Sequence, residues 1–113
     1  MNAETLVADY PAPTILNAKG DYLHYKDCNG GVFISSGPYP GIAIGQEVAF
    51  SATFDNSDSG LAWRVKVETA RDVTNGVVDA FSREHLLENT LITVQFRVGT
   101  KKSDPRTYKL VFE

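Results

Sequence analysis

The sequence predicts an all-β fold, an antiparallel β-sandwich of about seven strands. Three observations lead to this expectation. Apolar residues recur at every second position in nearly every apolar run, as in strands with one buried and one solvated face. These runs follow one another at intervals of roughly ten residues, separated by Gly, Pro, Asn and Asp. No segment has a helical period long enough to connect parallel strands, which favours antiparallel pairing in two packed sheets, although the spacing alone also fits a barrel.

The first half of the chain contributes three of the expected strands. "DYLHY" and "GGVFIS" are short and are bounded by Asp, Asn and Gly turn residues. In "EVAFSATF", from Glu47 to Phe54, apolar side chains alternate with small or polar ones. This alternation predicts a half-buried strand.

The second half contributes the other four strands and one helical turn. "LAWRVKVETA" has an apolar face that includes Trp63 and a charged face, so Trp63 is expected in the core. "GVVDAF", "TLITVQFRV" and "TYKLVF" are the remaining strands, and the last two are expected to form a hairpin. Only "SREHLLEN" favours a helical turn, which Ser82 would cap and Leu86 and Leu87 would close against the core.

Length and composition fit a single domain. A chain of 113 residues is too short for two ordinary domains. Pro11 and Pro13 suit a stiff connector, so residues 1–12 are expected to form a linker or extension and residues 13–113 the sandwich. Hydrophobic residues at 42% and charged residues at 22% predict neither disorder nor membrane insertion. The first residues also lack the basic start and apolar core of a classical secretory signal.

The stretch "YPGIAIGQEVAF" contains two glycines that could belong to a phosphate-binding loop or to a turn before a strand. Pro38 and Pro40 fix φ on either side of Tyr39, and Gly41 and Gly45 permit tight turns. A phosphate loop would lead into the N-terminus of a helix, whereas a strand is predicted here. The turn interpretation is therefore favoured, and Tyr39 at its tip is expected to expose its ring.

The order of these segments resembles the immunoglobulin-like repeats of large bacterial surface and adhesin-like proteins. The resemblance is carried by "DYPAPTILNAKGDYLHYKD", a glycine pair before "VFIS", the "YPGIAIGQEVAF" corner and the hairpin "ITVQFRVGTKKSDPRTYKLVF". Such repeats share a Pro-rich entry, a "YPGM-A-GD" corner and a closing aromatic strand pair. They often have a Trp near the strand after the corner, whereas here Trp63 lies one strand later. The resemblance implies immunoglobulin-like topology, a display or adhesion role, neighbouring domains, an extracellular or cell-surface location and no catalytic residues.

Several function classes are disfavoured by the residues present. A net charge of −3 with scattered Lys and Arg argues against nucleic-acid binding. His24, His85 and Cys28 are too few for a structural zinc site, and one cysteine cannot form an intramolecular disulfide. No serine has a nucleophile elbow around it. The protein is therefore expected not to be an enzyme and to need no cofactor.

The segment "DNSDSG", residues 55–60, has the oxygen-rich side chains of the first half of a calcium loop. Position twelve of such a loop requires a bidentate Glu, but Lys66 occupies it here. Because Asp, Asn and Ser also stabilise ordinary turns, no metal is expected. Asp55 and Asp58 are the only candidate ligands.

Two functions remain open from the sequence. One is a structural or adhesive module that presents loops to a protein or cell-surface glycan. The alternative is a carbohydrate-binding module that uses exposed tyrosine rings. The hairpin loop "GTKKSDPR" adds three cations that could contact an acidic partner or a sugar. The candidate ligand-binding residues are Tyr22, Tyr25, Tyr39, Lys101, Lys102 and Arg106.

Overall fold

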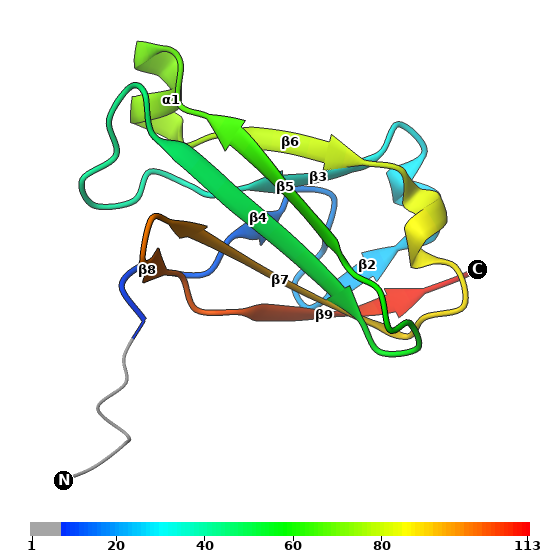
Figure 1. Ribbon diagram of the computed structural model, residues 1–113. Coiled ribbons are helices and arrows are strands. Elements are labelled where there is room, and N and C mark those ends of the chain that lie inside the picture. The colour runs from blue at the N-terminus through cyan, green and yellow to red at the C-terminus, as the bar shows by residue number, and fades with distance from the viewer. Residues whose placement is uncertain (1–7) are drawn as a thin grey trace, which may run out of the picture.

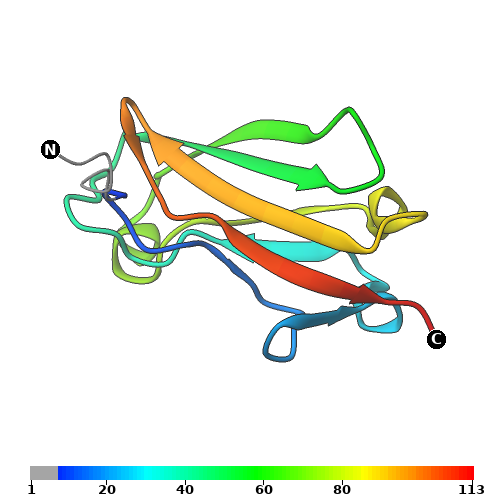
Figure 2. The same cartoon turned by 90° about the horizontal axis from the view of Figure 1, so that it is seen from below.

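Two β-sheets pack face to face in the computed structural model, which describes residues 8–113 (Figures 1 and 2). The larger sheet has the order β2-β9-β7-β4-β5, and β8 pairs with the end of β7. Its strands are β2 (Tyr22–His24), β4 (Glu47–Phe54), β5 (Leu61–Lys66), β7 (Leu91–Val98), β8 (Lys101–Lys102) and β9 (Arg106–Val111). The smaller sheet contains β1 (Thr14–Ile15), β3 (Val32–Ser35) and β6 (Val78–Phe81), in the order β1-β3-β6. The expected all-β sandwich is confirmed.

Pairing between the strands named above is antiparallel except at one edge of the larger sheet. β2 runs parallel to β9, with Leu23 opposite Leu110. The expectation of purely antiparallel sheets is wrong at this edge, because the chain leaves the smaller sheet after β1 and enters the larger one beside its last strand. The predicted pairing of the last two long strands is confirmed, with Ile92 of β7 opposite Tyr108 of β9.

The core lies between the two sheets and is centred on β4 and β7. Their inward side chains alternate as predicted, and the Phe50 and Phe96 rings lie 6.2 Å apart. Trp63 of β5 stacks on Phe50 at 5.6 Å and meets the edge of Phe81 in the smaller sheet at 5.8 Å. The predicted core position of Trp63 is therefore confirmed, although β5 is the last strand of its sheet and leaves the ring partly exposed.

The predicted helical turn is the 3-10 helix η3 (Arg83–Leu86). The Ser82 hydroxyl accepts a hydrogen bond from the Glu84 N–H, as a capping residue does. Leu86 is fully buried, but Leu87 is 47% exposed. The prediction for Leu87 is wrong because the turn ends at Leu86 and the backbone becomes extended at the next residue.

Within the described residues, two further helical segments were not predicted, namely η2 (Tyr25–Cys28) and α1 (Ala70–Asn75). α1 begins with a capping box in which the Thr69 hydroxyl and the Asp72 carboxylate each accept a backbone N–H. It ends at Gly76, where φ is 86° and a Cβ atom would lie 2.3 Å from the Gly37 carbonyl carbon. Within residues 8–113, no helix has the length and apolar character needed to cross a membrane.

Packing against the sandwich starts before residue 13. The Tyr10 N–H donates to the Lys102 carbonyl at 3.2 Å, and the Asp104 N–H donates to the Tyr10 carbonyl at 2.9 Å. The Tyr10 ring is buried and stacks on Phe96 at 5.6 Å. Asp9 and Tyr10, expected to belong to the linker, therefore lie against β8, while residues 1–7 of that expected linker lie outside the described residues.

Candidate ligand-binding face

The outer face of the larger sheet has a floor of small side chains. Ala49 and Ser51 of β4 and Ala62 of β5 point outward, because their neighbours along each strand point into the core. Ser51 lies opposite Ala62 on one side and Gln95 of β7 on the other. A shallow hollow of about 290 Å³ lies over this floor.

Cationic side chains flank this floor along one row of paired residues. Ala49 lies opposite Arg64 of β5 and, on its other side, opposite Arg97 of β7. Arg97 in turn lies opposite Lys102 of β8. Cross-strand partners share a face of a sheet, so Arg64, Arg97 and Lys102 all project outward. We call these three residues, with Ala49 between the arginines, the cation row.

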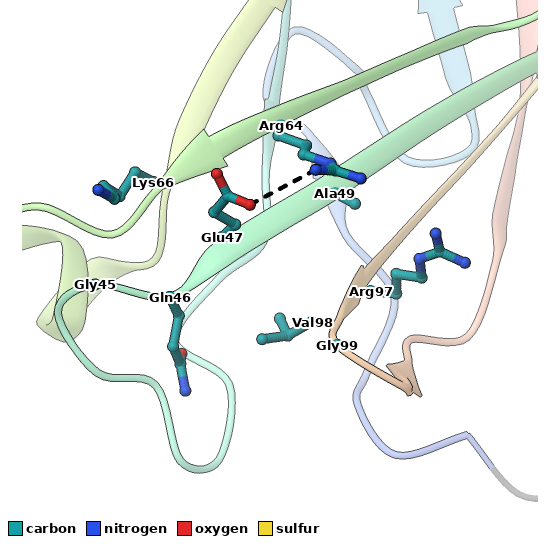
Figure 3. Close-up of a pocket in the computed structure, with 9 residues that line it drawn as sticks. All are labelled: Gly45, Gln46, Glu47, Ala49, Arg64, Lys66, Arg97, Val98 and Gly99. Carbon is teal, nitrogen blue, oxygen red and sulfur yellow. Dashed lines mark ion pairs between the residues drawn. The ribbon is translucent and has the colours of Figure 1, made fainter.

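Figure 3 shows the arginines of the cation row on either side of Ala49. Arg64 forms an ion pair with Glu47, with the nitrogen and oxygen atoms 3.7 Å apart. Arg97 and Lys102 form no ion pair with any of residues 8–113. The row therefore has a net positive charge even with Glu47 beside it.

The hollow continues toward the end of the sheet where β4 and β7 diverge. Their pairing stops at Ala49 and Arg97, and a second depression of about 550 Å³ opens beyond that point. Its walls come from the start of β4 and the end of β7, and Lys66 extends away from Arg97 at its far side (Figure 3). The lining residues are Gly45, Gln46, Glu47, Ala49, Arg64, Lys66, Arg97, Val98 and Gly99.

Two hydrogen bonds hold the chain around β8, at the Lys102 end of the cation row. Gln95 Nε2 donates to the Ser103 carbonyl at 2.8 Å, which holds this side chain against the segment after β8. The Lys102 backbone N–H donates to the Asp9 carboxylate at 3.1 Å. The Asp9 carboxylate thus accepts a hydrogen bond from the backbone of β8, and it forms no ion pair with the Lys102 ammonium group.

Tyr39 is not exposed, and the prediction of an accessible ring at this position is wrong. Its side chain is 2% exposed and packs against Tyr10 at 5.0 Å and Phe96 at 5.6 Å. The hydroxyl donates to Gln46 Oε1 at 2.6 Å, and Gln46 Nε2 donates to the Gly41 carbonyl. Burial raises the pKa of the Tyr39 hydroxyl, with a smaller contribution from Tyr10. The proline corner thus folds its tyrosine back into the core.

The three cations predicted around the last hairpin do not gather at one place. Lys102 belongs to the cation row, whereas Lys101 precedes it on the same strand and lies on the other side. Arg106 forms an ion pair with Asp21 at 3.0 Å and lies over the Tyr108 ring at 4.6 Å. Of the three predicted cations, only Lys102 shares a face with the hollow.

The other two predicted tyrosines lie away from the cation row. Tyr22 is 47% exposed and has the Lys109 ammonium group 5.7 Å from its ring. Lys109 pairs with Leu91, about 20 Å along β7 from Arg97. Tyr25 lies in η2, partly covered by the Arg83 guanidinium at 4.2 Å.

Asp55 is part of the fold rather than a free metal ligand. Its carboxylate accepts hydrogen bonds from the Thr90 hydroxyl and from the backbone N–H groups of Thr90 and Leu91. These bonds, that of the Thr90 hydroxyl first, lower the pKa of Asp55 to about 2. Asp58 lies exposed in the same loop. Across residues 8–113, no three His, Cys, Asp or Glu residues are grouped to hold a metal.

His24 and Cys28, two of the three possible zinc ligands considered in the sequence, have local roles in the fold. His24 Nδ1 lies 3.0 Å from the Glu113 carboxylate, and Lys26 lies 3.2 Å from the same oxygen. Hydrogen bonds from Lys26 and then His24 lower the pKa of Glu113. Cys28 is fully buried, and this burial raises its pKa above the ordinary thiol value. A thiol of this kind is a poor nucleophile.

The sequence did not identify Arg64, Arg97 or Gln95 as site residues. Alternation had already placed Arg64 on the solvated face of its strand. The missing information was the register that puts Arg64 and Arg97 on either side of Ala49. The small outward residues Ala49 and Ser51 were the available signal for a binding face, because small side chains between strands with charged residues leave space at the surface.

The chain was compared with models of known protein families, with curated proteins and with solved structures, and no match was found.

Proposed function

We propose that this chain is a non-catalytic, immunoglobulin-like β-sandwich module that adheres to an anionic partner through the outer face of its larger sheet. The observation that carries this proposal is the cation row, whose three positive side chains border a floor of small residues. Arg97 and Lys102 form no ion pair with the rest of residues 8–113, so they are available to a ligand.

The order of the strands supports the immunoglobulin-like part of the proposal. In variable-type immunoglobulin domains, strands G, F, C and C′ are neighbours in one sheet, while A, B and E belong to the other. β9, β7, β4 and β5 would take the first four positions here, and β1, β3 and β6 the other three. An experimental structure that gave another strand order would contradict this assignment.

We propose binding by the face of the larger sheet, and not by the loops as expected from the sequence, because of the contacts that the loop residues make. Several of the side chains expected to form a loop surface are already engaged within the fold. Tyr39 is buried, Asp55 is bonded to the start of β7 and Arg106 is paired with Asp21. The cation row instead leaves charged side chains at the surface. Complementary charge at a surface attracts a ligand of the opposite sign and guides its approach.

The test is a binding assay with a panel of immobilised polymers: dextran sulfate, polyglutamate, oligogalacturonate and neutral dextran. We expect the protein to bind at least one anionic polymer, more weakly as salt increases, and not to bind neutral dextran. The Arg64→Ala/Arg97→Ala double variant should lose about tenfold or more in affinity, since each lost charged hydrogen bond weakens binding.

A matched control separates the site from the overall charge of the protein. The Lys19→Ala/Lys26→Ala variant removes the same two charges from exposed positions outside the row. It should bind like the parent protein. Equal losses in the two double variants would overturn the proposed site, and the absence of binding to every anionic polymer would overturn the proposed function.

The alternative carbohydrate-binding surface is tested by Tyr22→Ala in the same assay. Tyr22 is the most exposed of the three predicted tyrosines and lies beside Lys109. Loss of binding in this variant, with retention in the double arginine variant, would place the ligand at β2 rather than at the cation row.

A further inference from the structure

We propose that the anionic partner is a glycan containing uronic acids, with one carboxylate over Ala49 between Arg64 and Arg97. We also propose that Glu47 competes with this carboxylate for Arg64. Both statements rest on the proposed function, and they specify the class of ligand and the residue that limits its affinity.

The spacing of the cation row fits a carboxylate held from two sides. Arg64 and Arg97 belong to strands on either side of β4, so their backbones lie about 10 Å apart. The small side chain of Ala49 leaves an open depression that Arg64 and Arg97 both line. A guanidinium group presents paired donors that match the two oxygens of a carboxylate. Two arginines that reach inward from opposite sides can thus share one carboxylate.

The hollow favours a glycan over an acidic protein partner. β4 is paired on both sides across the hollow, so a peptide cannot add to this part of the sheet as an extra strand. Protein interfaces usually place aromatic or large apolar anchors at their centre, whereas Ala49, Ser51 and Ala62 occupy the centre here. A sugar chain carries many hydroxyl groups, and the polar side chains of Ser51 and Gln95 line the hollow where such groups would lie.

The charge of the protein disfavours nucleic acid as the ligand. Affinity for nucleic acid comes mainly from neutralising many phosphates along the backbone. The row supplies three cations over about 14 Å on a chain whose net charge is −3. The spacing of the three cations is better matched by a polymer with fewer negative charges, such as a glycan with one carboxylate per sugar or per disaccharide.

Glu47 can be displaced from Arg64 by the carboxylate of a ligand, because the ion pair between Glu47 and Arg64 is weak. The Arg64 guanidinium nitrogen and the Glu47 carboxylate oxygen lie 3.7 Å apart. The side chain of Arg64 is 68% exposed and that of Glu47 is 58% exposed. An exposed pair of this kind is easily exchanged for another anion. Glu47 also repels a carboxylate that approaches Ala49. Removal of its charge should therefore strengthen binding of the ligand.

The experiment measures affinity for oligogalacturonate and hyaluronan, with methyl-esterified oligogalacturonate as the uncharged form of the first chain. We expect at least one uronic-acid chain to bind, and esterification to weaken the binding of oligogalacturonate at least about tenfold. Glu47→Gln should bind the charged chain about two to five times more tightly than the parent protein. The control is Asp58→Asn, which makes the same change of charge in the distant β4–β5 loop and should leave affinity unchanged.

The outcomes separate this inference from the proposed function. Arginine-dependent binding to dextran sulfate or polyglutamate, but to neither uronic-acid chain, would overturn the inference and leave the proposed function standing. Equal affinities of Glu47→Gln and Asp58→Asn for the charged chain would overturn the role of Glu47. No binding to any anionic chain would overturn both the proposed function and the inference. A thermal melt of each variant, compared with that of the parent protein, shows whether a variant that does not bind is still folded.

Discussion

Tyr108→Phe is expected to destabilise the sandwich by removing one hydrogen bond between its two sheets. Tyr108 lies on the inner face of β9 and is 1% exposed. Its hydroxyl accepts the backbone N–H of Ile15 in β1 of the smaller sheet, at 3.1 Å. Phenylalanine keeps the ring in place but removes the acceptor, which leaves a buried N–H without a partner.

The magnitude follows from the cost of an unpaired buried donor. Such a group costs about 1–3 kcal/mol of stability. For a domain of this size, each kcal/mol lowers Tm by roughly 4 °C, so a fall of roughly 4–12 °C is expected. Urea denaturation gives the free energy of unfolding, and amide hydrogen exchange at Ile15 should speed up more than exchange elsewhere in the core.

Tyr22→Phe is the matched control, because Tyr22 is an exposed tyrosine that forms no side-chain hydrogen bond within residues 8–113. It should leave the free energy of unfolding unchanged. Equal stability of the two phenylalanine variants, with no change in exchange at Ile15, would refute the reasoning.

Two further predictions concern residues whose sequence-based roles changed. Tyr39→Ala should cost about 3–5 kcal/mol of unfolding free energy, because its ring is 2% exposed and fills the core beneath the proline corner. A cost typical of a surface residue, measured in urea, would show that the ring is not buried in solution. Asp55→Ala should destabilise the protein at neutral pH. Folding lowers the pKa of Asp55 from 3.8 to about 2, so its contribution is present above pH 3.8 and is lost as the pH falls toward 2. The difference in stability between parent and variant should shrink over that range in acid titrations, and a constant difference would contradict this assignment.

The strands were predictable because side-chain alternation is a local property. Glu47–Phe54 is a strand with the bounds read from its sequence, since one face is apolar over its whole length. β1 and β8 were missed because strands of two residues show no period. α1 was also missed, although Thr69 and Asp72 carry the spacing of a capping box and Gly76 follows as its end.

The candidate site was less predictable because it depends on contacts between distant segments. Nothing near Arg64 in the sequence indicates that Arg97 lies two strands away on the same row, since register is set by the pairing of whole strands. The burial of Tyr39 was not predicted for a similar reason. Its neighbours Pro38 and Pro40 indicate a corner, but the cavity that its ring fills is made by Tyr10 and Phe96 from elsewhere in the chain.

The most direct test of the proposed binding face is an NMR titration of the isotope-labelled protein with the anionic chain that binds it most tightly. The expected result is that the largest changes in backbone amide chemical shift occur at Ala49, Arg64 and Arg97 and at their neighbours on β4, β5 and β7. Changes confined to Tyr22 and Tyr25, or to the loops between strands, would contradict binding at the cation row.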